Sequence, residues 1–311
     1  MKIVVLMSTY NGEKYLKQQI NSILNQTIVQ NNELKLLVRD DGSRDRTIKI
    51  LEEYEEKALL SFYVGNNIGV AASFWELIHK APDADFYAFS DQDDVWFEDK
   101  LECAVDKIKN NLNSQLPALY IGTFVSAKDE EICNGEYQLK NIGINRNTII
   151  DYSHSLIFSY GPGCTFVFNK NSLEEYKKID YNSYHFFMHD WMASKISLIK
   201  GEIFVDDRPM MYYRQHADNV IGDTSHGFCN YISRAKKIIF GETLGVRSCE
   251  AKILLDIYSA QMTESQKSDT DVLATYKKSL KNKIVFIKNK NFKNHNNKDF
   301  VVTLLALFNR L

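Results

Sequence analysis

Residues 86–96 read FYAFSDQDDVW, in which a short apolar run leads directly into three carboxylates within four residues. The apolar run has the length and composition of a buried strand. Asp91, Asp93 and Asp94 would repel one another unless a cation or a set of hydrogen-bond donors lay among them. Their hard oxygens suit Mg²⁺ or Mn²⁺, with substrate phosphates as further ligands. A solvated acidic loop that caps a helix starting near Glu98 is the alternative, and this stretch alone leaves both readings open.

The same alternation of apolar runs and polar clusters extends back to the amino terminus. Strands are predicted over residues 2–7, 34–38, 59–64 and 86–89, and an amphipathic helix follows each of the first three. This order is typical of βαβ units, which build a parallel sheet with ligands at the carboxyl ends of its strands. Asp40 and Asp41 alone are more simply explained as part of an ordinary turn. In this sheet, however, they are expected close to the Asp91 cluster.

The pattern changes further along the chain. Strands are predicted over residues 118–125, 165–168, 202–205 and 210–213, and a helix is predicted to open near His189. Beyond about residue 221 the strand patterns stop and helical periodicity dominates. We therefore expect an α/β domain over residues 1–222, with a mainly parallel central sheet flanked by helices. A helical carboxyl-terminal region is expected over residues 223–311.

The charge of the chain is a sum over separate regions. With 40 acidic and 38 basic residues, the formal net charge is -2 and hydrophobic residues make up 44% of the 311 residues. This composition excludes wholesale disorder and a uniformly basic nucleic-acid binder. Residues 277–298 nevertheless hold eight lysines and no acid, and a mostly apolar end follows. This region is expected either to contact an anionic membrane surface or to form a helical appendage with solvated lysines.

Signals for export are not expected. The apolar run over residues 3–7 is too short for the core of a signal peptide, and no run approaches the length of a membrane span. Five scattered cysteines without a CxxC pair favour a reduced compartment and no structural zinc. We therefore expect a cytoplasmic protein, with peripheral contact to the inner face of the cell membrane if the basic end binds lipid.

Six short segments, taken in their order along the chain, resemble the motifs of a known protein family. STYNG at 8–12, RDDGS at 39–43, NIG at 67–69, SDQDDVW at 90–96, HDW at 189–191 and YRQH at 213–216 resemble glycosyltransferase family 2. The resemblance covers about residues 1–222 and implies the GT-A nucleotide-sugar fold. Among family members, the forms RDDGS, SDQDDVW, HDW and YRQH look most like bacterial rhamnosyltransferases of surface-polysaccharide assembly.

The resemblance implies roles for individual residues. The nucleotide-sugar is expected to contact Ser8, Tyr10, Asp40, Asp41, Asn67, Gly69, Asp91 and Arg214. A divalent Mg²⁺ or Mn²⁺ is expected on Asp93, Asp91 and His216. Asp190 matches the general base, and Trp191 and Gly163 match the acceptor side. From the residues alone, Asp190 is more simply explained as an N-cap, and Trp191 could equally be a core side chain.

The implied reaction is an inverting transfer of a sugar from a dTDP- or UDP-sugar to a hydroxyl of a growing, lipid-linked cell-surface polysaccharide. One alternative is a sugar nucleotidyltransferase, which carries an early glycine-rich phosphate loop with an arginine, whereas residues 8–13 here read STYNGE. Another is a carbohydrate-binding protein of the same fold without turnover. Intact Asp93 and Asp190 argue against that reading.

Overall fold

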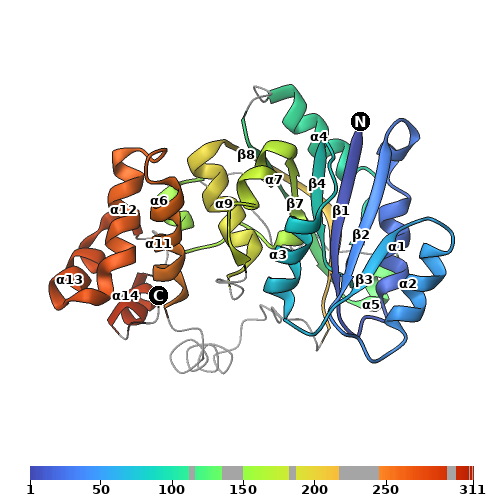
Figure 1. The fold of residues 1–311 in the computed structure, drawn as a ribbon, viewed down its shortest axis with the longest axis horizontal. Coiled ribbons are helices and arrows are strands. Elements are labelled where there is room, and N and C mark those ends of the chain that lie inside the picture. The colour runs from blue at the N-terminus through green and yellow to red at the C-terminus, as the bar shows by residue number, and fades with distance from the viewer. Residues whose placement is uncertain are drawn as a thin grey trace. The chain divides into compact units, whose positions relative to one another are not determined.

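The computed structural model describes residues 1–111, 116–134, 150–181, 187–216, 245–292, 299–307, 309 and 311 (Figure 1). The chain divides into two compact units. The first comprises Met1–Thr148 and Tyr160–Gly222, and the second comprises Ile149–Ser159 and Asp223–Leu311.

The first unit is built on one sheet with the strand order β3-β2-β1-β4-β7-β6-β8-β5. β1 pairs in parallel with β2 and β4, β2 with β3, and β6 with β8, whereas β7 runs antiparallel between β4 and β6. The α/β prediction with a mainly parallel sheet is confirmed. The strands are β1 Lys2–Thr9, β2 Glu33–Asp40, β3 Ser61–Val64, β4 Phe86–Ser90, β5 Val95–Trp96, β6 Ala118–Ala127, β7 Phe166–Asn169 and β8 Glu202–Arg214.

Helices cover both faces of this sheet. Residues 3–7 of β1 form an uninterrupted apolar run, as expected for a strand that is buried on both faces. Ile3, Val5 and Met7 join a core with apolar side chains of α1 and α4, and α3 contacts β1 and α9. The helices are α1 Leu16–Leu24, α2 Thr47–Glu55, α3 Val70–Lys80, α4 Lys100–Asn111, α5 Asp129–Asn134, α7 Lys170–Tyr176 and α9 His189–Lys200, with 3-10 turns at Thr27–Gln30 and Gly163–Thr165.

Two features of the sheet differ from the sequence prediction. The two strands predicted at 202–205 and 210–213 are one continuous strand, β8, whose pairing with β6 shifts register on both sides of the Thr123–Pro209 pair. These irregularities let the strand pass a proline and polar residues that appeared to end it. The two-residue strand β5 was too short to predict from periodicity. It pairs with β8 at Val95 and Trp96 and so anchors the acidic loop before it.

The second unit is helical, as predicted. Ser153 Oγ donates to Asp269 Oδ2 at 2.5 Å, and a 2.7 Å hydrogen bond joins Tyr152 to Thr270, so α6 is fastened to α12. Among the residues that the structure describes, no helix is both long and apolar enough to cross a membrane. The helices are α6 Tyr152–Ser155, α11 Val246–Tyr258, α12 Glu264–Thr275, α13 Leu280–Lys288 and α14 Asp299–Leu307, with 3-10 turns at Tyr276–Lys278 and Lys290–Phe292.

Candidate active site

A cavity of about 740 Å³ opens at the carboxyl ends of β1 to β4 in the first unit. The chain turns back there from the outer strand β3 to β4, beside β1, and open α/β sheets bind ligands at such a switch point. Most of the residues singled out from the sequence line it: Ser8, Tyr10, Asp41, Asn67, Gly69, Asp91, Asp93, Gly163, Asp190 and His216. Asp40, Trp191 and Arg214 are not among its lining residues.

Asp41 forms part of the cavity wall and is held firmly in place. Arg39 Nη1 and the backbone N–H of Ile68 donate to its Oδ1 at 2.6 and 2.8 Å. The backbone N–H of Gly69 donates to Oδ2 at 2.9 Å. Gly69 has a φ of 84°, a conformation that favours glycine. Because an ionised carboxylate has about four acceptor positions, Asp41 keeps one for a ligand in the cavity.

Arg39, which the sequence reading left without a role, organises this wall. Its side chain is 1% exposed. Nε donates to Glu76 at 2.7 Å, and Nη2 donates to the Asn66 carbonyl at 3.0 Å. It therefore joins β2, the loop after β3 and helix α3 around Asp41. The available signal was its place directly before the two aspartates, but the sequence does not show which way the side chain points.

Asp40 lies inside the protein and organises its own loop. It is fully buried, and Oδ1 accepts from the backbone N–H groups of Gly42 and Ser43 at 3.1 and 2.8 Å. Oδ2 accepts from the hydroxyls of Ser43 and Thr9 at 2.5 and 3.0 Å. With both oxygens engaged, Asp40 shapes the loop that presents Asp41. Its expected contact with the nucleotide-sugar gains no support from this placement.

Gln92 fixes the first loop of the cavity to the acidic loop. Its Oε1 accepts from the backbone N–H of Tyr10 at 2.9 Å, and its Nε2 donates to the Tyr10 carbonyl at 3.1 Å. A Cβ placed on Gly12 would lie 2.2 Å from Gln92 Oε1, so a larger residue at that position would displace the Gln92 side chain from this contact. The sequence reading passed over Gln92, although it lies within the motif.

The three aspartates of the acidic loop have different surroundings. Asp91 and Asp93 line the cavity, whereas Asp94 is 1% exposed and points into the protein. Burial and the nearby charge of Asp93 raise the pKa of Asp91 to about 7. Burial likewise raises the pKa of Asp94 well above its ordinary value. A cation on the cavity side would favour the ionised forms.

Beneath the loop, a buried lysine already supplies one positive charge. Lys100 Nζ donates to the Cys164 carbonyl at 2.5 Å and lies 3.7 Å from the centroid of the Trp96 ring. Burial lowers the pKa of Lys100 to about 8. Ligand atoms of Asp91, Asp94 and Cys164 lie within 4.8 Å of one another. Because burial also raises the pKa of the Cys164 thiol, this set suits Mg²⁺ or Mn²⁺ poorly.

On the cavity side the donor set fits a hard divalent cation better. His216 Nε2 and Asp93 Oδ2 are 2.8 Å apart, and both residues line the cavity with Asp91. Two carboxylates and an imidazole leave room for phosphate oxygens or water in the shell of Mg²⁺ or Mn²⁺.

Arg214 holds the acidic loop in place from the side that faces away from the cavity. It is 2% exposed, and its Nε donates to the Asp93 carbonyl at 2.6 Å. It also contacts Gln18, at 2.6 Å, and Asp129. These contacts make Arg214 a positioning residue, and its expected contact with the diphosphate stays a prediction.

Asp190 lies at the opposite wall, in the first turn of α9. It is 3% exposed, its Oδ2 accepts from the backbone N–H of Gly163 at 3.1 Å, and its Oδ1 accepts from the N–H of Trp191 at 2.8 Å. The N-cap of the helix is Met188, so Asp190 is not the N-cap. Trp191 is partly exposed and lies outside the cavity lining, with Lys195 Nζ 5.4 Å from the centroid of its ring. Its expected contact with the acceptor is a prediction that this geometry does not support.

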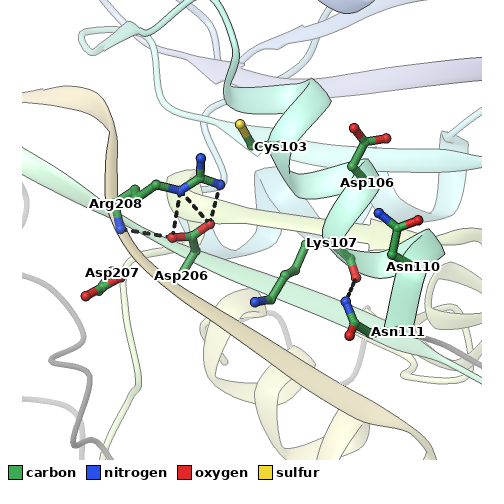
Figure 2. A pocket seen from close by; sticks show the side chains of 8 residues that line it. All are labelled: Cys103, Asp106, Lys107, Asn110, Asn111, Asp206, Asp207 and Arg208. Atoms are coloured by element: carbon green, nitrogen blue, oxygen red, sulfur yellow. Dashed lines mark hydrogen bonds and ion pairs between the residues drawn. The ribbon is translucent and has the colours of Figure 1, made fainter.

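A second hollow in the first unit, of about 470 Å³, is formed by α4 and β8 (Figure 2). Arg208 reaches back to Asp206, and its Nη2 lies 2.7 Å from Asp206 Oδ2. Asn111 Nδ2 donates to the Lys107 carbonyl at 2.8 Å. This hollow contains none of the residues singled out from the sequence, and we assign it no role.

Comparisons with known proteins agree with this geometry. The family model described as glycosyl transferase family 2 matches residues 4–177. The dTDP-rhamnosyl transferase RfbG of Shigella flexneri is 30% identical over 231 residues, which cover 70% of this chain and 73% of that protein. The UDP-Glc:alpha-D-GlcNAc-diphosphoundecaprenol beta-1,3-glucosyltransferase WfgD of Escherichia coli is 34% identical over 115 residues, or 36% of this chain and 43% of that enzyme.

The fold is similar to that of a solved glycosyltransferase. The crystal structure of residues 1–349 of TarS from S. aureus in complex with UDP superposes with a TM-score of 0.56 at 17% sequence identity. The superposition covers 99% of this chain and 87% of that one. At this identity the likeness shows a shared fold.

Proposed function

The chain belongs to glycosyltransferase family 2 and has its GT-A fold, and we propose that it is an inverting, metal-dependent enzyme of cell-surface polysaccharide synthesis. Its donor is a dTDP- or UDP-linked sugar, and its acceptor is a hydroxyl of a growing, lipid-linked saccharide. The observation that supports this most is that Asp41, Asp93 and Asp190 line one cavity, although they follow different strands or open a helix. Glycosyl transfer needs a site for the nucleoside, one for the diphosphate with its cation and one for the acceptor. Asp41, Asp93 and Asp190 would serve these three sites in that order.

The nucleoside occupies the part of the cavity lined by Ser8, Tyr10, Asp41, Asn67 and Gly69. Uracil and thymine each offer an imide N–H, and the remaining acceptor position of Asp41 suits it. Tyr10 is 44% exposed and offers an aromatic face at the mouth of the cavity. The rigid hold of Arg39 on Asp41 keeps this acceptor in place before the ligand arrives.

Asp91, Asp93 and His216 would hold the divalent cation. When bound, Mg²⁺ or Mn²⁺ supplies positive charge that stabilises the departing diphosphate. Arg214 keeps the Asp93 backbone in position for this task through its 2.6 Å contact with the carbonyl.

Asp190 acts as the general base on the acceptor side. Its carboxylate takes the proton of the acceptor hydroxyl as that oxygen forms a bond to the anomeric carbon. The bond from that carbon to the nucleotide diphosphate breaks on the opposite face, which inverts the configuration. The hydrogen bonds from Gly163 and Trp191 orient the carboxylate, and burial of Asp190 keeps bulk water away from the reacting centre.

Two relatives support a choice of substrates. The Shigella protein is a dTDP-rhamnosyl transferase, and it matches 70% of this chain. The E. coli relative is named for a saccharide acceptor on diphosphoundecaprenol. We extend both to this chain: rhamnose from dTDP-rhamnose is the proposed transferred group, and a lipid-linked saccharide is the proposed acceptor.

A thermal-shift panel tests donor, base and metal together. Nucleotide-sugars carrying dTDP, UDP or GDP are added with and without Mg²⁺ or Mn²⁺. We expect dTDP- or UDP-sugars with metal to raise the melting temperature by about 5 °C or more at a hundredfold excess over Kd, since binding then stabilises by about 2.7 kcal/mol. Asp93→Asn is expected to remove the metal-dependent part of the shift.

The outcomes of this panel separate the competing classes. No stabilisation by any nucleotide-sugar would contradict the proposal. Formation of a nucleotide-sugar from a nucleoside triphosphate and a sugar phosphate would indicate a nucleotidyltransferase. Binding without acceptor-stimulated release of nucleotide would indicate a carbohydrate-binding protein without turnover.

The second unit carries a surface suited to an anionic membrane. Leu280 and Ile284 of α13 are 73% and 46% exposed, and Val285 is 47% exposed. Exposed apolar side chains on a short helix cost free energy unless they are covered. The lysines of this helix and its flanks that are exposed are Lys278, Lys281, Lys288 and Lys290. Each such lysine gains about 1 kcal/mol near anionic lipid, so we propose that α13 makes peripheral contact with the membrane that carries the acceptor.

Sedimentation with vesicles tests this contact. The chain is expected to sediment with phosphatidylglycerol vesicles at low salt, and much less with phosphatidylcholine vesicles or at high salt. The double variant Leu280→Asp, Ile284→Asp is expected to remain in the supernatant. Leu59→Asp is the matched control, because Leu59 is 40% exposed on the first unit. Equal sedimentation of both variants, or none by the unaltered chain, would contradict membrane contact through α13.

A further inference from the structure

His189 is a buried side chain whose polar atoms have no partner in the described part of the chain. It is 3% exposed, and neither Nδ1 nor Nε2 makes a hydrogen bond to any residue that the structure describes. Its ring stacks on Phe74, with centroids 4.0 Å apart, and meets Phe89 edge to face at 4.6 Å. These contacts fix the ring without using either nitrogen.

The imidazole is neutral in this environment. Burial lowers the pKa of His189 to about 3, so near neutral pH the ring carries one N–H donor and one acceptor nitrogen. Buried polar groups are almost always hydrogen-bonded, because an unpaired one loses its bond to water without replacement. An aromatic residue without polar atoms would keep the two ring contacts and avoid this cost. The presence of histidine therefore needs a reason beyond packing.

The position of the ring supplies the reason. His189 lines the same cavity as Asp190, the next residue along α9. A Cβ on Gly163 would lie 2.5 Å from His189 Nε2 and 3.2 Å from Asp190 Cβ. Nε2 and the Asp190 side chain thus flank one glycine of the cavity wall. Nε2 itself is buried against Gly163, so a hydroxyl beside the Asp190 carboxylate reaches this nitrogen once the ligand displaces that glycine slightly.

We propose that His189 is a sugar-binding residue whose Nε2 makes a hydrogen bond to one hydroxyl of the sugar bound beside Asp190. A hydroxyl both donates and accepts, so it matches a neutral imidazole in either tautomer, whereas a phosphate would be better served by a cation. A substrate that lacks this hydroxyl would leave the buried nitrogen unpaired, which makes His189 a determinant of sugar specificity. This inference rests on the proposed glycosyl transfer.

A matched pair of variants tests it. His189→Phe keeps an aromatic ring against Phe74 and Phe89 but removes both polar atoms, whereas His189→Gln keeps a donor and an acceptor. We expect His189→Phe to lower kcat/KM by about tenfold to a hundredfold, with an unchanged thermal shift by UDP or dTDP alone. His189→Gln is expected to recover part of the loss.

Deoxy-sugar substrates identify the contact. The unaltered chain and His189→Phe are each assayed with a series of monodeoxy donors and monodeoxy acceptors. For one analogue we expect a large loss in the unaltered chain and no further loss in His189→Phe, because the partner is already missing. If the affected analogue is a donor, the hydroxyl belongs to the donor sugar, and if it is an acceptor, the hydroxyl belongs to the acceptor sugar.

Several results would overturn the inference. One is that every analogue lowers kcat/KM by the same factor in both proteins. Another is that His189→Phe is as active as the unaltered chain, or that His189→Gln is the more damaging variant. By contrast, failure of the unaltered chain to bind any nucleotide-sugar would contradict the proposed function itself. If His189→Phe does not fold, the comparison of His189→Gln with the unaltered chain over the same analogues gives the test.

Discussion

Replacing Asp190 with asparagine is expected to lower kcat by about 10²–10⁴-fold, the usual contribution of a general base. Asparagine has the same shape, and its amide oxygen can still accept from the backbone N–H of Gly163 or Trp191. It cannot take the proton from the acceptor hydroxyl. The measurement is the steady-state rate of nucleotide release with acceptor present, together with the KM for the donor, which is expected to change little.

Two controls keep the Asp190 experiment specific. Nucleotide-sugar should raise the melting temperature of Asp190→Asn as much as that of the unaltered chain, because the proposed nucleoside site is built around Asp41 and does not include Asp190. Asp93→Asn should instead lose the metal-dependent shift. A near-normal transfer rate in Asp190→Asn would exclude this residue as the base, and loss of donor binding would assign it a structural role.

Replacing Arg39 with methionine is expected to lower the free energy of unfolding of the first unit by about 3–5 kcal/mol, the usual result of removing one partner of a buried ion pair. Arg39 and Asp41 are 1% and 4% exposed, and Glu76 is 17% exposed on the other side of the guanidinium. Without Arg39, Asp41 loses its counter-charge, and the Asn66 carbonyl loses a donor. Glu76 loses the same partner and keeps its pair with Lys80. Nucleotide-sugar binding is expected to fall as well, because Asp41 is no longer held.

Urea unfolding followed by tryptophan fluorescence measures this loss. All three tryptophans, Trp75, Trp96 and Trp191, lie in the first unit, so the signal reports that unit. Lys17→Met is the matched control. Its pair with Glu53 is exposed on both sides, by 52% and 55%, so its removal is expected to change the stability little. Equal midpoints for the two variants would show that Arg39 does not stabilise the wall.

Much of the fold could be predicted from the sequence because periodicity reflects burial. The strand over residues 2–7 and the helix Val70–Lys80 were both predicted, since one is buried on both faces and the other has a broad apolar face. β5 and the continuity of β8 could not be predicted. A two-residue strand has no period, and a register shift that passes Pro209 depends on the partner strand.

The sequence predicted some residues of the candidate site but not others. Motif positions singled out Asp91, Asp93 and Asp190, because carboxylates at strand ends and helix starts indicate ligand chemistry, and all three line the cavity. His189 and Arg39 stood inside the same motifs but received no role. Their importance comes from what surrounds them: two aromatic rings and a glycine in one case, two carboxylates and a carbonyl in the other. Residues distant in the sequence supply these partners.

The sequence by itself determined that aspartates follow β2 and β4 and that the chain is a glycosyltransferase of family 2. The tertiary structure alone decided which aspartates of each group line the cavity. Asp40 ends β2, and neighbouring residues of an extended strand point in opposite directions, whereas bends at Gln92 and Asp93 turn the acidic loop. Asp41 and Asp93 therefore line the cavity, while Asp40 and Asp94 are turned into the protein. There Asp40 accepts hydrogen bonds that fix its loop, and so the same residue type shapes the loop at one position and is available to a ligand at the next.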